Sequence, residues 1–106
     1  MVLIKREPEP QGANYAAIVL SSKYCTLLDL DDYDRLCQYR YRPKRKKKKI
    51  YAVRRFKHQG KTYEITMHNE IMHPPNGFDV HHKKHNTLDN RKSELEIVPH
   101  NSHPHY

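Results

Sequence analysis

The segment DVHHKKHNTLDNR, residues 79–91, places His81 and His82 next to each other between a short apolar run and a polar loop. Imidazole binds borderline divalent metals, and near neutral pH it can also act as a general base. Adjacent residues of an extended strand point to opposite faces, so the two rings cannot easily bind one metal ion together. The spacing favours a division of roles, in which one histidine holds a metal ion and the other activates a water molecule within about 3 Å.

A second group of histidines lies in the final segment, HNSHPHY. If residues 79–82 and 94–98 pair as antiparallel strands, the chain returns beside His81 where PHNSH begins. The candidates for a second metal ligand are therefore His100, His103 and His105. The alternative is that these histidines form a surface tail or a fortuitous metal-binding tract.

The positive charge of the chain is concentrated in one region. The formal net charge is +8, and the stretch from Arg35 to Tyr63 holds 13 of the 20 lysines and arginines and no acidic residue. Such a block repels itself unless something negative lies against it, and a nucleic-acid backbone is the usual partner. The alternative is a solvated loop that keeps the protein soluble. PKRKKKK also resembles a nuclear import signal, a pattern of low specificity.

Composition limits the fold to one small domain. The chain has 106 residues, of which 36% are hydrophobic, and its two cysteines lack metal-ligand spacing. We expect one modest core, inert cysteines and a reducing, cytoplasmic compartment. No apolar stretch approaches the roughly 20 residues that cross a bilayer, so no membrane association is expected. MVLIKREPEPQ lacks the apolar segment of a signal peptide, so export is not expected either.

Apolar runs and turn residues predict an α+β fold that begins with small β-hairpins. Residues 1–12 are charged and contain two prolines, which predicts a flexible arm. Runs rich in β-branched and aromatic residues, separated by polar turns, predict strands that pair as hairpins. The first predicted hairpin joins residues 15–20 to 24–30, and the second joins residues 50–57 to 61–67.

Short helices are predicted at three places. DDYDRLCQY can begin with Asp31 or Asp32 as its cap, and its acidic first turn favours a helix N-terminus. HNEIMH, residues 68–73, is predicted to form one or two helical turns that end at a pair of prolines. The last residues, PHNSHPHY, should begin a helix that Pro104 shortens or distorts. FDVHH and LEIV are predicted to be the short strands between the second and third helices.

The segment ITMHNEIMHPPNGFDVHHKKHNTLDNRKSELEIVPHNSH resembles the HNH endonucleases, the ββα-metal nucleases that are common in phages and among homing enzymes. Their pattern runs M-H-R-x-I-M, a Pro/Gly turn, V-D-H-x-x-G-N-x-L-D-N-R-x-x-N-L-R-x-V and, after a few residues, Asn or His. The matching positions are Met67, His68, Ile71, Met72, Gly77, Val80, His81, His82, Asn86, Leu88, Asp89, Asn90, Arg91, Leu95, Val98 and His103. With the upstream YAVRRF and LDLDDYDRL, the resemblance covers residues 14–103.

The resemblance implies hydrolysis of phosphodiester bonds in double-stranded DNA with one divalent metal ion. His82 matches the general base that takes a proton from the attacking water, and Asn90 is expected to act with it by bracing the loop. His81 stands where most relatives have a metal-binding Asp, as in the colicin-type DNases, and His103 matches the second metal ligand. The products would carry 5′-phosphate and 3′-hydroxyl ends.

The chain departs from the family pattern at two loop positions. Glu94 replaces the central Asn of N-L-R, and an ionised Glu only accepts hydrogen bonds. His85 replaces the loop Gly, which would demand a different turn. Additional metal-binding or loop-bracing roles are therefore assigned to Glu94, His100 and His105. Mg²⁺, Mn²⁺ or Ni²⁺ is expected to support activity, whereas Zn²⁺ suits imidazole ligands but need not support turnover.

The expected organisation has three parts within one compact domain: the arm at residues 1–12, a β-rich part at 13–66 that binds the DNA backbone, and the ββα-metal motif at 67–106. Because Arg54 and Arg55 are strand neighbours, at most one should meet a given DNA surface. Residues 40–49 are predicted to form a basic loop that holds the DNA backbone, and such contacts position the DNA without reading its sequence. The predicted DNA-binding residues are Arg40, Arg42, Lys44, Arg45, Lys46, Arg54, Arg55, Arg91 and Lys92.

Two other functions compete with a nuclease. One is a catalytically impaired nucleic-acid-binding protein that retains the HNH fold, to which Glu94 would point. The other is a structural zinc module, which is disfavoured because no cysteine pair exists and such sites have four ligands. The chain is expected to act as a monomer or weak dimer in a bacterial or phage-infected cell. Homing, restriction and phage genome packaging are the open roles, with the packaging machinery as a candidate partner.

Overall fold

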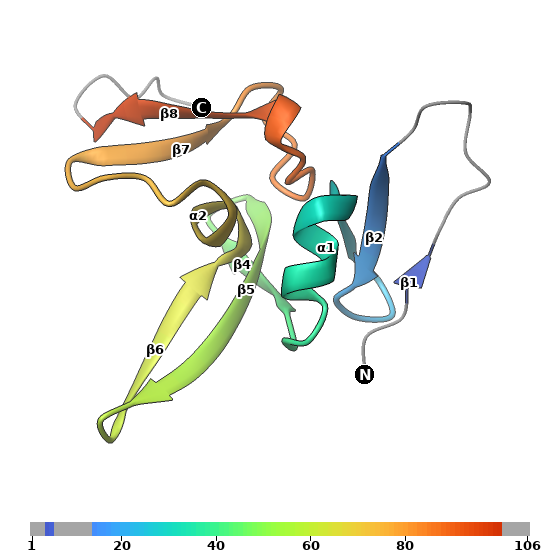
Figure 1. Ribbon diagram of the computed structural model, residues 1–106, viewed down its shortest axis with the longest axis horizontal. Coiled ribbons are helices and arrows are strands. Elements are labelled where there is room, and N and C mark those ends of the chain that lie inside the picture. The colour runs from blue at the N-terminus through green and yellow to red at the C-terminus, as the bar shows by residue number, and fades with distance from the viewer. Residues whose placement is uncertain (1–3, 6–13, 101–106) are drawn as a thin grey trace.

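The computed structural model describes residues 4, 5 and 14–100, and within them the fold is mixed α and β, with more strand than helix (Figure 1). The predicted α+β class is confirmed at this level. The strands form three separate antiparallel sheets. The predicted terminal helix from residue 101 onward, His103 and His105 lie outside the described residues. In the described part, no helix has the length and apolar character needed to cross a membrane.

The first sheet contains the predicted N-terminal hairpin. Strand β2 (Tyr15–Val19) pairs with β3 (Cys25–Asp29), which confirms the hairpin. Within residues 1–12, which were predicted to form a flexible arm, the structure describes only β1 (Ile4–Lys5), where Ile4 pairs with Ile18. Charged, Pro-rich sequence carries no local strand signal, and the open edge of β2 supplies the backbone partners that such a segment can use.

Helix α1 (Leu30–Leu36) follows β3 directly. Its N-cap is Asp29 and not Asp31 or Asp32, and the Asp29 carboxylate makes no capping bond within the helix. The carboxylate instead accepts a hydrogen bond from the backbone N–H of Lys92 (2.9 Å). The helix therefore begins earlier in the chain than the sequence predicted. The carboxylate of its N-cap residue serves a tertiary contact with Lys92 and does not cap the helix.

The second sheet holds the basic region. Strand β5 (Lys49–His58) lies between β4 (Arg42–Lys46) and β6 (Lys61–Thr66), which confirms the second hairpin. The predicted loop at residues 40–49 is wrong for most of its length, because β4 pairs with the first half of β5 around a tight turn. Lysine-rich sequence has low strand propensity, but an edge strand tolerates both charged side chains and Pro43.

The third sheet is the β7–β8 hairpin, and both strands were predicted. Helix α2 (Met67–Met72) is capped by Thr66, whose side chain accepts a hydrogen bond from the Asn69 N–H (3.4 Å), and it precedes β7 (Phe78–His82). A loop and the short 3-10 turn η1 (Lys92–Glu94) lead to β8 (Leu95–Pro99), which pairs antiparallel with β7. Figure 1 shows α2 between this hairpin and the second sheet, and its contacts reach both.

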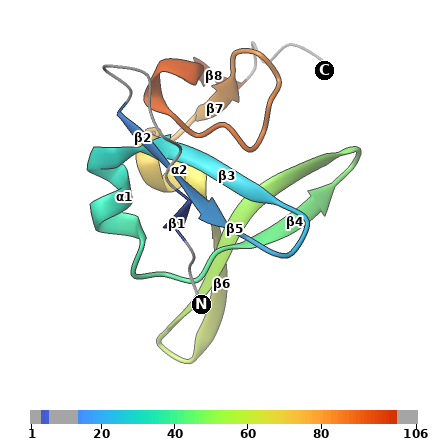
Figure 2. The same cartoon turned by 90° about the vertical axis from the view of Figure 1, so that its right-hand side faces the viewer.

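One hydrophobic core joins the three sheets and the two helices. Figure 2 shows the arrangement of these elements from a second side. Its buried members are Ala16, Ile18, Leu28, Tyr33, Leu36, Tyr41, Ala52, Met67, Ile71, Val80 and Leu95. A buried carboxylate borders this core. Glu70 accepts hydrogen bonds from the Tyr41 hydroxyl (2.6 Å) and from Arg54 Nε (3.0 Å). The Arg54 guanidinium also lies over the Tyr39 ring, with 3.7 Å to the ring centroid.

Replacement of Glu70 by Gln should lower the free energy of unfolding by about 2 kcal/mol, because the charged hydrogen bonds to Arg54 and Tyr41 are lost. Burial opposes ionisation of Glu70, but hydrogen bonds from Arg54 and Tyr41 hold its pKa below the ordinary value. The stabilisation is therefore present above the unfolded pKa and is lost as pH falls through the folded pKa. Urea unfolding at neutral and acid pH measures this.

The matched control is Glu64→Gln, which removes the carboxylate of an exposed pair with Lys44. It should change the free energy of unfolding by no more than about 0.5 kcal/mol. Equal losses in the two variants would contradict a structural role for Glu70.

Candidate active site and basic cleft

A cleft of about 990 Å³ lies between the second sheet and β7. Its second-sheet wall comes from one face of β4, β5 and β6, because residues two apart on a strand share a face. The residues that line this wall are Lys44, Lys46, Lys49, Tyr51, Val53, Glu64 and Thr66. The opposite side is lined by His68, Asn69, Asp79, Val80, His82, Thr87 and His100, with Lys47 and Lys48 at the turn. The cleft therefore combines a basic wall with histidines.

His82 is the last residue of β7 and is 4% exposed. Its Nε2 lies 2.9 Å from Oδ1 of Asn90, which is fully buried. The Asn90 amide nitrogen donates to Thr26 Oγ1 (2.9 Å), and the Thr26 hydroxyl donates to the Leu88 carbonyl (2.7 Å). One chain of hydrogen bonds thus joins β3, the loop after β7 and the ring of His82.

The direction of this chain fixes the tautomer of His82. The Thr26 hydroxyl has one proton and gives it to a carbonyl, so it accepts from Asn90 and places the amide NH₂ group on its side. Asn90 Oδ1 then faces His82 and can only accept, so His82 Nε2 carries the ring proton. Nδ1 is left with a lone pair that can take a proton. Burial lowers the pKa of His82, with His81 and Lys49 adding to this against the effects of Asn90 and Asp89, so the ring is neutral near pH 7.

Two further rings pack against His82. The centroid of the His68 ring lies 4.8 Å from that of His82 at an interplanar angle of 76°, and Tyr51 contacts both histidines. Burial, with the nearby charges of His82 and Lys46, lowers the pKa of His68 to about 3. His68 is therefore neutral near pH 7 and adds no positive charge beside the ring of His82.

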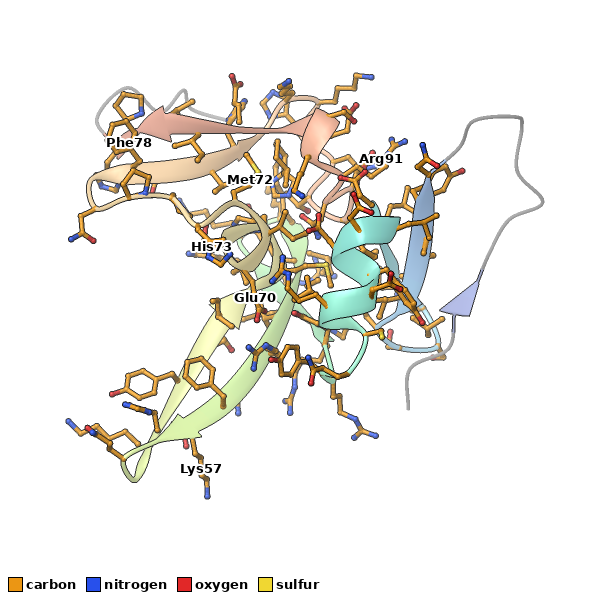
Figure 3. All side chains as sticks on the ribbon, in the orientation of Figure 1. Lys57, Glu70, Met72, His73, Phe78 and Arg91 are labelled. Atoms are coloured by element: carbon orange, nitrogen blue, oxygen red, sulfur yellow. The ribbon has the colours of Figure 1, made fainter. Side chains whose placement is uncertain are left out.

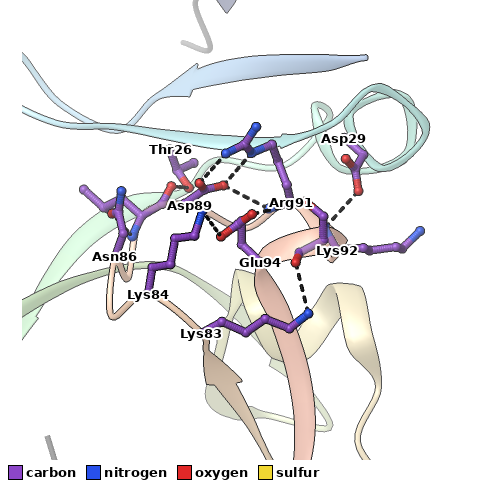
Figure 4. A network of polar contacts seen from close by, with 11 residues as sticks. Thr26, Asp29, Lys83, Lys84, Asn86, Asp89, Arg91, Lys92 and Glu94 are labelled. Carbon is purple, nitrogen blue, oxygen red and sulfur yellow. Dashed lines mark hydrogen bonds and ion pairs between the residues drawn. The ribbon is translucent and has the colours of Figure 1, made fainter. Parts of the chain in front are cut away.

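The loop between β7 and η1 is held by backbone and ionic contacts (Figure 4). Asn90 donates its backbone N–H to the Leu27 carbonyl (2.7 Å), and Asp89 binds the Arg91 guanidinium through two hydrogen bonds of 2.8 and 2.6 Å. Glu94 pairs with Lys84 at 3.7 Å, so its side chain braces the loop from outside, while Asn90 contacts His82.

His85 adopts a φ of 62°, in the left-handed region that favours glycine. The HNH pattern has Gly at this position. His85 takes up this left-handed conformation itself, which histidine tolerates better than most side chains, and the expectation of a different turn stays a prediction.

The predicted DNA-binding residues divide into two groups. Lys44 and Lys46 line the cleft, and Arg55 shares their sheet face through its pairing with Glu64. Arg40, Arg42 and Arg45 are exposed. Five of the predicted residues already have carboxylate partners: Lys44 and Arg55 with Glu64, Arg54 with Glu70, Arg91 with Asp89, and Lys92 with Asp32. Arg54 lies on the opposite sheet face from Arg55 and serves the core border, as the strand alternation predicts.

The predicted metal ligands are only partly described. His81 is 7% exposed and shares a face of the β7–β8 hairpin with Glu96, whose carboxylate lies 3.9 Å from His81 Nε2. The His85 ring stands 5.6 Å from that of His81, and His100 Nδ1 lies 2.7 Å from the Asp79 carboxylate. Over residues 4, 5 and 14–100, no three His, Cys, Asp or Glu side chains gather closely enough to hold a metal. The donor types around His81 suit a divalent transition metal, but His103 is needed to complete the predicted pair.

Sequence reasoning missed three residues of the site. Thr26 is 64 positions from Asn90, and nothing local in YCTLLDL marks its hydroxyl as part of a distant network. His68 was given no role beyond its match to the M-H-R segment, and that match is the signal that could have drawn attention to it. Lys49 was counted as part of a charge run, and only the register of β5 places it on the cleft wall.

Comparison of the chain with protein-family models, with curated proteins and with solved structures finds no match. The geometry of the cleft therefore has to carry the functional argument.

In the metal-free protein near pH 7, His82 is expected to carry its proton on Nε2, with Nδ1 unprotonated. Long-range ¹H–¹⁵N NMR of the histidine rings in EDTA distinguishes the two tautomers directly. Asn90→Ala should produce a mixture of tautomers, because the amide oxygen that accepts from Nε2 is gone. Asn76→Ala, a change at an exposed asparagine of the turn before β7, should leave the spectrum of His82 unchanged. A proton on Nδ1 in the wild type would refute the proposed direction of the hydrogen-bond chain.

Proposed function

We propose that this protein is a metal-dependent DNA endonuclease of the HNH type, with His82 as its general base. The observation that carries the proposal is the hydrogen-bond chain from Leu88 through Thr26 and Asn90 to His82, in a cleft with a lysine-rich wall. A base needs a lone pair at working pH, a fixed orientation and a substrate within reach. The first two follow from the tautomer and the burial of His82, and the lysines provide a surface for a phosphodiester.

In the proposed reaction, His82 Nδ1 takes a proton from a water molecule as the water oxygen attacks the phosphorus. The bond from phosphorus to the 3′ oxygen breaks, which leaves a 5′-phosphate and a 3′-hydroxyl. Lys46 and Lys49 hold the phosphodiester backbone by charge, which positions the DNA and does not read its sequence. A divalent metal ion, held by His81 with His103, would supply positive charge to the phosphate and the departing oxygen.

A second candidate is a nucleic-acid-binding protein that uses the cleft without cutting. The observation that favours it is the position of His81, which the β7–β8 register groups with Glu96 and which is not among the described residues that line the cleft. The two candidates share the basic wall and differ only in turnover, so a cleavage assay separates them.

Supercoiled plasmid is expected to relax to open circle in the presence of Mg²⁺, Mn²⁺ or Ni²⁺, and not in EDTA. Replacement of His82 by Ala should reduce the rate by about 10²- to 10⁴-fold, the usual contribution of general-base catalysis. The matched control is His73→Asn, because His73 is exposed and has a φ of 49° that asparagine tolerates. Retardation of DNA without cleavage, identical in wild type and His82→Ala, would support the binding protein and end the nuclease proposal.

The register of β4 also makes a prediction about binding. Lys46 lines the cleft, whereas its neighbour Arg45 is exposed on the other sheet face. Lys46→Ala should therefore reduce the slope of log K against log salt by about 1, the effect of one lost phosphate contact. Arg45→Ala should leave the slope unchanged. Fluorescence anisotropy with a short duplex in EDTA measures the slope for both variants. A reduced slope in the Arg45 variant alone would contradict DNA binding along the cleft wall.

A further inference from the structure

The outer part of the β5–β6 hairpin is a two-stranded ribbon that leaves the body of the protein (Figure 1). Strand β4 pairs with β5 only from Lys49 to Val53, so the residues from Arg54 to His58 have β6 as their strand partner. An isolated two-stranded ribbon is only marginally stable in water. Figure 3 shows Lys57 near the free end of this ribbon.

One face of the ribbon carries an exposed aromatic pair. Phe56 and Tyr63 are cross-strand partners, and their rings stack with 5.6 Å between centroids and an interplanar angle of 23°. They are 38% and 43% exposed, among the most exposed large hydrophobic residues of the described chain. A group of exposed apolar side chains outside the core commonly marks a binding surface.

The same ribbon is basic. Arg55 and Lys57 lie on the face opposite the aromatic pair, and His58 and Lys61 are paired at its end. Arg55 belongs to the sheet face that continues into the cleft wall beside His82. His58 and Lys61 share the face of the aromatic pair, so this face carries basic groups beside apolar surface and fits a polyanion that also presents an apolar feature.

We propose that this ribbon enters the major groove of double-stranded DNA, with Phe56 and Tyr63 against the base edges. The major groove is about 12 Å wide and admits a two-stranded β-ribbon, and thymine methyl groups are its apolar feature. His58 and Lys61, which share the face of the aromatic pair, then lie toward the phosphates of the groove wall, and Arg55 and Lys57 point away from the base edges. The inference rests on the proposed function only in taking DNA as the partner, and it adds a groove and a contact that the cleft alone does not define.

The test compares the wild type with the double variant Phe56→Ala/Tyr63→Ala. The matched control is Phe78→Ala, because Phe78 is a similarly exposed aromatic residue (41%) on the β7–β8 hairpin. Fluorescence anisotropy in EDTA gives the Kd for a short duplex and for the same duplex with deoxyuridine in place of every thymidine, which removes only the methyl groups. The double variant should raise the Kd for the thymine duplex about tenfold. The loss of the methyl groups should raise the Kd of the wild type about threefold and leave the Kd of the double variant unchanged. This difference is expected if the aromatic side chains contact the thymine methyl groups.

Unchanged Kd in the double variant, or equal sensitivity of wild type and variant to the methyl groups, would overturn the proposal. Displacement of the wild type by netropsin, a minor-groove ligand, would overturn it as well. Circular dichroism should show that the variant keeps its fold. If plasmid is cut but the ribbon variant binds normally, the groove contact fails and the nuclease stands. If the methyl-dependent binding appears without cleavage, the nuclease fails and the groove contact stands.

Discussion

The buried amide of Asn90 is the constraint on which the candidate site depends. It joins β3 to the end of β7 through Thr26 and His82, and its backbone N–H bonds to Leu27 beside it. A buried amide without partners would destabilise the fold by a few kcal/mol, so each of these groups holds the others in place. The loop after β7 can therefore carry lysines and a left-handed His85 while the ring of His82 stays fixed.

A second constraint is the alternation of side chains along β5. It directs Lys49, Tyr51 and Val53 toward the cleft, and it turns Arg54 to the other face, where Glu70 binds it. A run of cations that looks uniform in the sequence is thereby divided into a surface for an anion and one structural arginine. The remaining lysines repel one another across the β4–β5 turn, and that repulsion is relieved when a polyanion lies against them.

The sequence was informative where structure is local. Runs rich in apolar, β-branched and aromatic residues predicted the strands of the hairpins β2–β3, β5–β6 and β7–β8, and the two prolines behind HNEIMH predicted the end of α2. It failed where partners are distant. Strand β4 forms from arginine and lysine because β5 offers it an edge, β1 forms because β2 does, and the Asp29 carboxylate is taken by Lys92. The hydroxyl of Thr26 belongs to the site for the same reason, and no periodicity in the chain could reveal it.

The paired histidines can now be given a physical explanation. One step along β7 moves a side chain from the cleft, where His82 meets Asn90, to the hairpin face where His81 meets Glu96. Burial lowers the pKa of His82 although its hydrogen bond with the Asn90 amide opposes this shift, whereas His81 lies beside the Glu96 carboxylate. Two identical residues thus acquire opposite electrostatic surroundings from the pleat of a single strand. In the proposed nuclease, the base and the metal ligand would be different residues of one strand, so the metal ligand would not compete for the proton that the base takes.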